Sequence, residues 1–121
     1  MIDGTPLDEA IARIDARVAP MPKHYTIGCL YPTHAQTALE AARARNPSVV
    51  ARVRGIKANA SPLSPEELDR LGRVDATAPE QFACDLMACA SEFGLSILGG
   101  CCGTDAADIE ALAELVRRAR P

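Results

Sequence analysis

The chain has 121 residues, of which 48% are apolar and 24% charged, and its formal net charge is −3. This length fits one domain, residues 1–121, and the negative charge argues against a surface that binds nucleic acid or an anionic membrane. No apolar run approaches the roughly 18 residues of a membrane span, and five cysteines without a regular framework favour a reducing cytoplasm over disulfides.

The N-terminal third predicts a helix, a strand and a second helix. Thr5 and Pro6 form a helix-start pattern, and a short apolar strand is expected at residues 25–29. A capping-box pattern at Thr33 to Gln36 then predicts the second helix. The apolar stripes of the two helices are Leu7, Ile11, Ile14 and Val18, and Ala35, Ala38, Leu39 and Ala42.

The rest of the chain repeats this alternation. Strands are expected at 49–58 and 95–98, with a short helical turn between Ser64 and Gly72. A helix opens at Pro79 and closes at Gly94, and a last helix opens at Thr104 and Asp105. Their inward faces are predicted to be Phe82, Leu86, Cys89, Ala90 and Phe93, and Ile109, Leu112, Ala113 and Val116. Short apolar strands alternating with amphipathic helices indicate an α/β fold made of parallel βα units.

The run from Gly99 to Thr104 contains two adjacent cysteines, Cys101 and Cys102, between a predicted strand and a predicted helix. A third cysteine, Cys29, closes the first predicted strand. Because the carboxyl ends of parallel strands form one working edge, we expect the three thiols to converge. Thiolate sulfur is a preferred ligand of zinc, and catalytic zinc sites commonly use three protein ligands. The sequence therefore predicts a zinc site at Cys29, Cys101 and Cys102.

Other interpretations of these residues remain open. The adjacent cysteines could instead form a packed pair or a vicinal disulfide, and Cys29 could be a small apolar residue that ends a strand. His34 is an alternative ligand, although a surface role fits it better, and His24 is expected in a solvent-facing loop. Two further pairs are interpreted structurally: Cys84 and Cys89 as helix-packing residues, and Arg52 and Arg54 as surface or salt-bridging groups.

Three segments together resemble the homocysteine S-methyltransferase family of zinc enzymes, which are built on a (β/α)8 barrel. They are Ile27-Gly28-Cys29, Lys57-Ala58-Asn59-Ala60 and Gly99 to Thr104, in the family's order and at about its spacing. The double-glycine, double-cysteine element is the most specific of them. The resemblance implies a partial barrel, the last three strand-helix units of the eight. Two departures stand out: Gly28 replaces an asparagine, and Lys57-Ala58 replaces an aromatic residue and proline.

The resemblance implies that zinc activates the thiol of homocysteine, or a similar small thiol, to accept a methyl group and give methionine. Asn59 would bind the amino acid or order its loop. The donor is left open among S-methylmethionine, S-adenosylmethionine, a betaine and a methylfolate acting through cobalamin. Because a partial barrel leaves a bare sheet face, we expect homo-oligomerisation or association with a missing barrel half. The alternative is a non-catalytic zinc-binding or assembly module, a truncated relic of the family.

Overall fold

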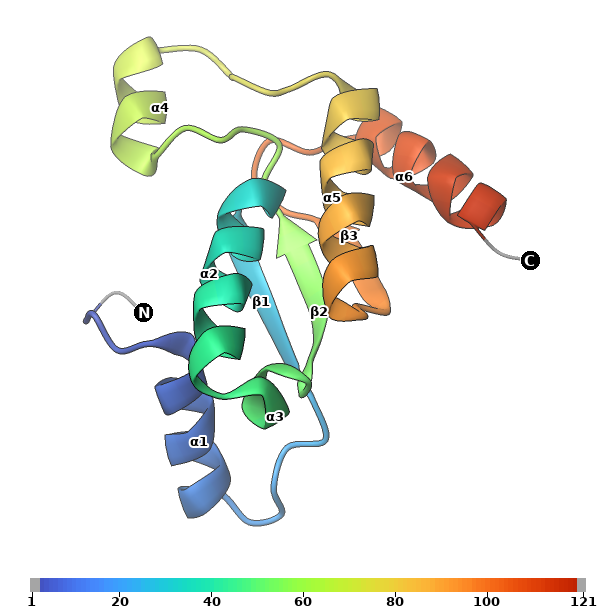
Figure 1. Cartoon of the computed structure of the whole chain (residues 1–121). Coiled ribbons are helices and arrows are strands. Elements are labelled where there is room, and N and C mark those ends of the chain that lie inside the picture. The colour runs from blue at the N-terminus through green and yellow to red at the C-terminus, as the bar shows by residue number, and fades with distance from the viewer. Residues whose placement is uncertain (1–2, 120–121) are drawn as a thin grey trace.

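The computed structural model describes residues 3–119, and within them one parallel sheet has three strands in the order β1-β2-β3 (Figure 1). This arrangement confirms the predicted α/β class and its parallel βα units. The strands are β1 (Tyr25–Leu30), β2 (Val53–Ala58) and β3 (Ile97–Gly100). The helices are α1 (Leu7–Arg17), α2 (Pro32–Arg45), α3 (Pro47–Val50), α4 (Pro65–Leu71), α5 (Pro79–Phe93) and α6 (Ala106–Ala119). None of these helices has the length and apolar character needed to cross a membrane.

The hydrophobic core lies between one face of the sheet and the helices α2 and α5, which stand in front of β1 and β2 in Figure 1. Ile56 of β2 is buried under Leu39 of α2 and under Phe82 and Leu86 of α5, all with almost no exposed surface. Aliphatic side chains supply most of this core because the chain has only two Phe, two Tyr and no Trp. The predicted inward stripes of α2 and α5 are thus largely confirmed.

The other face of the sheet carries few side chains. Strand register places its residues in two rows, Thr26–Gly55–Ile97 and Gly28–Lys57–Gly99. We call these six residues the open face, since Thr26, Lys57 and Ile97 are exposed and no described helix covers them. A Cβ atom on Gly55 would lie 2.9 Å from the Cβ of Ile97 and 3.0 Å from the Oγ1 of Thr26, so only glycine fits between these neighbours.

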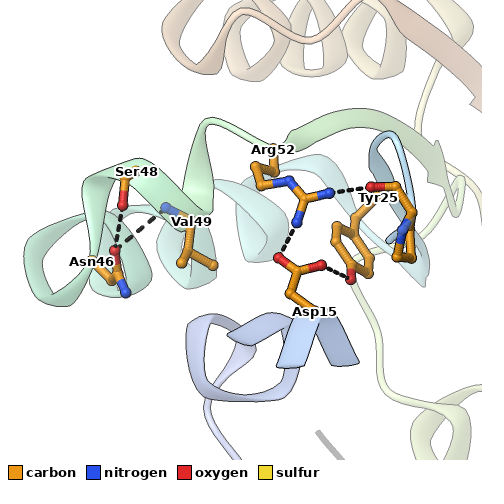
Figure 2. A network of polar contacts seen from close by, with 7 residues as sticks. Asp15, Tyr25, Asn46, Ser48, Val49 and Arg52 are labelled. Atoms are coloured by element: carbon orange, nitrogen blue, oxygen red, sulfur yellow. Dashed lines mark hydrogen bonds and ion pairs between the residues drawn. The ribbon is translucent and has the colours of Figure 1, made fainter. Parts of the chain in front are cut away.

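A polar network ties α1 to the amino ends of the strands (Figure 2). The Tyr25 hydroxyl donates a hydrogen bond of 2.6 Å to Asp15, and Arg52 forms an ion pair with the same carboxylate. Arg52 also donates to the carbonyl oxygen of Pro22. The salt-bridging interpretation of Arg52 is confirmed, and Arg54 is exposed. The polar side chains at this end of the sheet thus stabilise the fold, and the candidate site residues lie at the carboxyl ends of the strands.

Several predicted boundaries need correction. The strand expected at 49–58 begins only at Val53, because Pro47–Val50 forms α3, capped by the side chain of Asn46 (Figure 2). The strand expected at 95–98 is Ile97–Gly100, so both glycines of the motif are strand residues. Helix α2 begins at Pro32 after Tyr31, and the predicted cap at Thr33 is wrong. By contrast, the predicted start at Ser64 and the predicted ends at Gly72 and Gly94 are confirmed. A capping box forms at Ser64, and both glycines are left-handed.

Some apolar residues predicted to face inward are exposed instead. Ile14 and Ile109 are 41% and 44% exposed, and Ala38 and Val18 are also exposed. Ile14 and Ala38 line a groove between α1 and β1, while Ile109 lines a groove beside β3. Both grooves lie at edge strands of the sheet, where the described chain has no further element to cover them.

Candidate metal centre

The carboxyl ends of the three strands meet at the upper edge of the sheet in Figure 1. Cys29 lies near the end of β1, and Cys101 follows β3 directly. Because β2 pairs with both strands, its own end at Ala58 lies between them, and the Ala58 carbonyl accepts a 2.7 Å hydrogen bond from the Cys101 N–H. The sheet therefore brings together cysteines that are 72 residues apart in the chain.

Cys29 is held in an uncommon backbone conformation. Its φ is +59°, in the left-handed region that L-residues other than glycine rarely adopt. The register explains this value: Gly28 pairs with Lys57 and Leu30 pairs with Ala58, so Cys29 is an extra, bulged residue. A bulge redirects one side chain without moving the rest of the strand, and bulges are common next to active sites. The Cys29 thiol consequently points to the carboxyl edge while Leu30 turns back toward the core.

The turn after β3 positions the other two cysteines. The Thr104 hydroxyl donates a 2.8 Å hydrogen bond to the carbonyl of Cys101, closing the turn. This requires glycine at position 100, since a Cβ there would lie 2.3 Å from the Thr104 Oγ1 and 2.8 Å from its Cβ. Gly103, with φ of +77°, lets the chain leave the turn toward α6. The Thr104 side chain thus closes the turn. Asp105 caps α6 by accepting a hydrogen bond from the Ala107 N–H.

The three sulfur atoms form a compact triangle. Cys29 Sγ lies 3.1 Å from Cys101 Sγ and 3.9 Å from Cys102 Sγ, and the last two are 4.0 Å apart. A tetrahedral zinc ion with bonds of about 2.3 Å holds its sulfur ligands about 3.8 Å apart. Two of the three separations match this value, and a small rotation of one side chain would bring the third to it. We call Cys29, Cys101 and Cys102 the thiol cluster; it is the one metal-ligand group found among residues 3–119.

The thiols in the cluster do not ionise equally. The pKa of Cys29 is raised to about 11 because hydrogen bonds to Cys101 and Cys102, and the negative charge that they carry as thiolates, favour its protonated form. The pKa of Cys101 lies below its ordinary value, chiefly because its sulfur accepts the hydrogen bond from Cys29. The backbone N–H of Cys102 and the positive charge of Lys57 act in the same direction on Cys101. Metal binding to thiols releases their protons, so a divalent cation would compete with the hydrogen bond between these two sulfur atoms.

Asn59 orders the loop beside the cluster. Its side-chain oxygen accepts a 3.3 Å hydrogen bond from the Cys102 N–H, and its own N–H donates to the Leu30 carbonyl. The neighbouring Ala60 N–H donates to the Cys102 carbonyl. Of the two roles considered for Asn59, loop ordering is the one for which the structure shows contacts. A group that fixes the backbone of a metal ligand in this way affects metal binding without touching the ion.

The donor set fits zinc. Cysteine sulfur is a soft ligand that favours zinc among common divalent cations, and the group found among the described residues consists of cysteines alone, without the carboxylates that magnesium or calcium prefers. Cys29 and Cys102 are exposed, so the cluster is accessible from the outside of the molecule. Accessible three-ligand sites are typical of catalytic zinc, whereas structural zinc is usually enclosed by four protein ligands.

A family model described as homocysteine S-methyltransferase matches residues 1–116. The chain belongs to the homocysteine S-methyltransferase family. No curated protein and no solved structure matches the chain. The thiol cluster lies where the three segments that resemble the family converge. These segments occupy the carboxyl ends of β1, β2 and β3, and they are Ile27-Gly28-Cys29, Lys57 to Ala60 and Gly99 to Thr104.

The other candidates from the sequence lie outside the cluster. His34 is on the exposed side of α2, with its ring 6.3 Å from that of Tyr31, and it does not join the metal-ligand group. His24 is exposed, as predicted. Cys89 is buried in the core, but Cys84 is exposed, so the packing role predicted for Cys84 is wrong. The sequence did not predict the hydrogen bond by which Thr104 closes the turn at Cys101. The only signal for this contact was the glycine at position 100.

Proposed function

We propose that this family member binds one zinc ion through Cys29, Cys101 and Cys102 and presents the thiol of homocysteine for methylation, giving methionine. The observation that carries the proposal is the triangle of sulfur atoms, none more than 4.0 Å from another. Bound zinc would supply Lewis-acid chemistry that lowers the pKa of a substrate thiol. The thiolate is the nucleophile in sulfur chemistry, so this change in pKa is what methyl transfer requires.

Each residue of the site has a part in this proposal. The bulge at Cys29 and the turn closed by Thr104 hold the ligands in advance, which reduces the free-energy cost of ordering them on binding. Asn59 fixes the backbone at Cys102. In the reaction, the substrate sulfur forms a bond to the methyl carbon of the donor. The bond from that carbon to the donor atom breaks with its electron pair, and the thiol proton leaves to solvent.

The methyl donor is the least constrained part of the proposal. A sulfonium donor such as S-methylmethionine or S-adenosylmethionine would lose its positive charge in the transfer, and a betaine would do the same at nitrogen. A methylfolate acting through cobalamin would need a further protein surface. S-methylmethionine is the donor to test first because it needs no additional partner.

We also propose that further polypeptide covers the two apolar edge grooves and the Thr26–Gly55–Ile97 row of the open face, as a second copy of this chain or as the remainder of a (β/α)8 barrel, and leaves the row with Lys57 accessible. Ile14, Ile97 and Ile109 are between 41% and 46% exposed around these surfaces, and β1 and β3 are unpaired edges within residues 3–119. Exposed edges and apolar patches of this kind are normally covered in stable proteins. Sedimentation of the purified chain tests self-association, and a strictly monomeric, well-folded species would exclude the second copy.

Metal analysis and spectroscopy test the zinc proposal. We expect one zinc per reduced chain, and a cobalt-substituted sample whose visible spectrum changes when homocysteine is added. Cys102→Ser should lower zinc affinity by more than about 100-fold, since removing only a partner of a ligand already costs about 10- to 100-fold. Cys84→Ser, a matched change at an exposed cysteine on α5, should have no effect.

Three outcomes separate the candidate functions. Turnover of homocysteine with S-methylmethionine supports the methyltransferase. Tight zinc binding with a spectrum that homocysteine leaves unchanged would instead support a non-catalytic zinc module. Thiols that stay metal-free under reducing conditions would refute both.

A further inference from the structure

Lys57 has an unusual setting on the open face. In its row the neighbour on β1 is Gly28 and the neighbour on β3 is Gly99, so no side chain flanks it on either side. Side chains on adjacent strands normally contact each other and account for much of the stability of a sheet. The row therefore lacks two such contacts, and Lys57 is its only residue with a side chain.

The lysine stem leans toward one of the two glycines. A Cβ on Gly28 would lie 3.7 Å from the Lys57 Cβ and 3.8 Å from its Cε, which places the stem across Gly28. On the other side, nothing lies within 4 Å of the position that a Gly99 Cβ would take. The space beside the lysine on the β3 side is therefore open.

The ammonium group of Lys57 forms no ion pair with a carboxylate among residues 3–119. The ion pairs of this part of the chain involve arginines, and Lys57 donates no side-chain hydrogen bond within it. The sheet thus displays an exposed cation with open space beside it, and no carboxylate among residues 3–119 pairs with it. An accessible cation in this setting is suited to bind an anionic group of a ligand.

The row lies directly below the thiol cluster. Gly28 immediately precedes Cys29, and Gly99 precedes Cys101 by two residues. At about 3.3 Å per strand residue, the row is one or two residues from the backbone of the ligands.

We propose that Lys57 is a positioning residue that binds the carboxylate of a small thiol whose sulfur is held at the thiol cluster. This inference rests on the proposed function and extends it to the substrate class: short aliphatic thiols that carry a carboxylate, in preference to thiols of the same shape without one. A flexible four-carbon stem lets the ammonium group follow a carboxylate a few bonds away from the bound sulfur. The open space on the Gly99 side leaves room for the carbon chain that links the two groups.

The test compares homocysteine with homocysteinamide, which replaces the carboxylate by a neutral amide of nearly the same shape. Both are titrated into the cobalt-substituted full chain, and the change in the visible spectrum gives each affinity. We expect the native chain to bind homocysteine about five- to tenfold more tightly, the range for a charge-assisted contact at an accessible site. The preference should shrink as salt is raised, because the contact is exposed to solvent.

Variants locate the effect. Lys57→Gln should remove the preference while leaving the affinity for homocysteinamide unchanged, and Lys57→Arg should retain it. Arg54→Gln, an exposed cation on the same strand outside the row, serves as the matched control and should behave as the native chain. Zinc stoichiometry and circular dichroism of each variant establish that folding and metal binding are intact.

The outcomes distinguish this inference from the proposed function. Equal affinity of the native chain for the two thiols would overturn the role of Lys57 and leave thiol binding at the metal standing. An equal loss of affinity for both thiols in Lys57→Gln would also overturn it, because the lysine would then act on the metal site alone. If neither thiol changes the spectrum of the native chain, both proposals fail.

Discussion

Gly100 and Gly99 are adjacent glycines at the end of β3, and we predict opposite results when each is changed to alanine. A methyl group at position 100 would come within 2.3 Å of the Thr104 Oγ1 and 2.8 Å of its Cβ, whereas one at position 99 meets nothing within 4 Å. Overpacking of this kind costs about 1–3 kcal/mol. Breaking the Thr104 hydrogen bond to Cys101 adds about 0.5–1.5 kcal/mol. Gly100→Ala should therefore lower the free energy of unfolding by about 2–4 kcal/mol, while Gly99→Ala should be neutral or slightly stabilising.

Urea unfolding followed by circular dichroism measures the first effect, and competition with a chelator measures zinc affinity. Because the displaced turn carries two of the three ligands, Gly100→Ala should also weaken zinc binding, and Gly99→Ala should not. In a Thr104→Gly background, which removes all three close contacts, the cost of Gly100→Ala should fall below about 1 kcal/mol. If the two alanine variants match in stability and zinc affinity, the account of the Gly100–Thr104 turn is wrong.

Three further predictions address accessibility, the Asn59 contact and pH. In the zinc-free, reduced chain an alkylating reagent should modify four of the five cysteines, all but Cys89, which is buried. With zinc bound only Cys84 should react, and protection confined to fewer than three thiols would contradict the proposed ligand set. Asn59→Ala should lower zinc affinity about tenfold through the lost contact to the Cys102 N–H, whereas Asn46→Ala, the same change at the α3 cap, should not; equal chelator-competition curves for the two variants would refute this role. A hydrogen bond from Arg45 holds the pKa of Asp8 below its ordinary value, so the stability that it contributes is complete above about pH 4 and is lost as pH falls through the lowered pKa. Melting temperatures measured from pH 5 to pH 3 should thus fall less steeply for Asp8→Asn than for the native chain or the exposed control Glu9→Gln, and parallel curves would exclude the contribution.

The thiol cluster could be predicted from the sequence because short strands place the cysteines, and because parallel strands always end at the same edge of a sheet. Each cysteine follows a short apolar strand, and parallel strands present their carboxyl ends together, so convergence required no knowledge of side-chain detail. The bulge at Cys29 was not predictable in the same way. Its only cause is a shift of register against β2, and no residue type in Gly28-Cys29-Leu30 signals such a shift.

The errors in the secondary structure have similar physical causes. Val49 and Val50 favour a strand by composition, yet Pro47 and the Asn46 cap place them in a helical turn. Ile14 and Ile109 fit the apolar stripes of their helices and are nevertheless exposed. Periodicity identifies an apolar face, but it does not tell whether the surface that covers this face belongs to the same stretch of chain. The role of Asn59 was ambiguous for a related reason, since its partner is a backbone N–H 43 residues away.

Cys29, the extra residue in β1, contributes a side chain to the thiol cluster without taking part in the pairing of the strands. Since Gly28 and Leu30 pair with consecutive residues of β2, the pleat and the core are satisfied without any contribution from the side chain between them. The ligand at position 29 is therefore exchangeable. Asparagine and aspartate tolerate the left-handed backbone there better than most residues, and histidine shares this tolerance. Cys29→His would turn the proposed all-sulfur centre into a mixed nitrogen and sulfur centre on an unaltered scaffold, which makes this one position the natural place to change the metal preference of the proposed site.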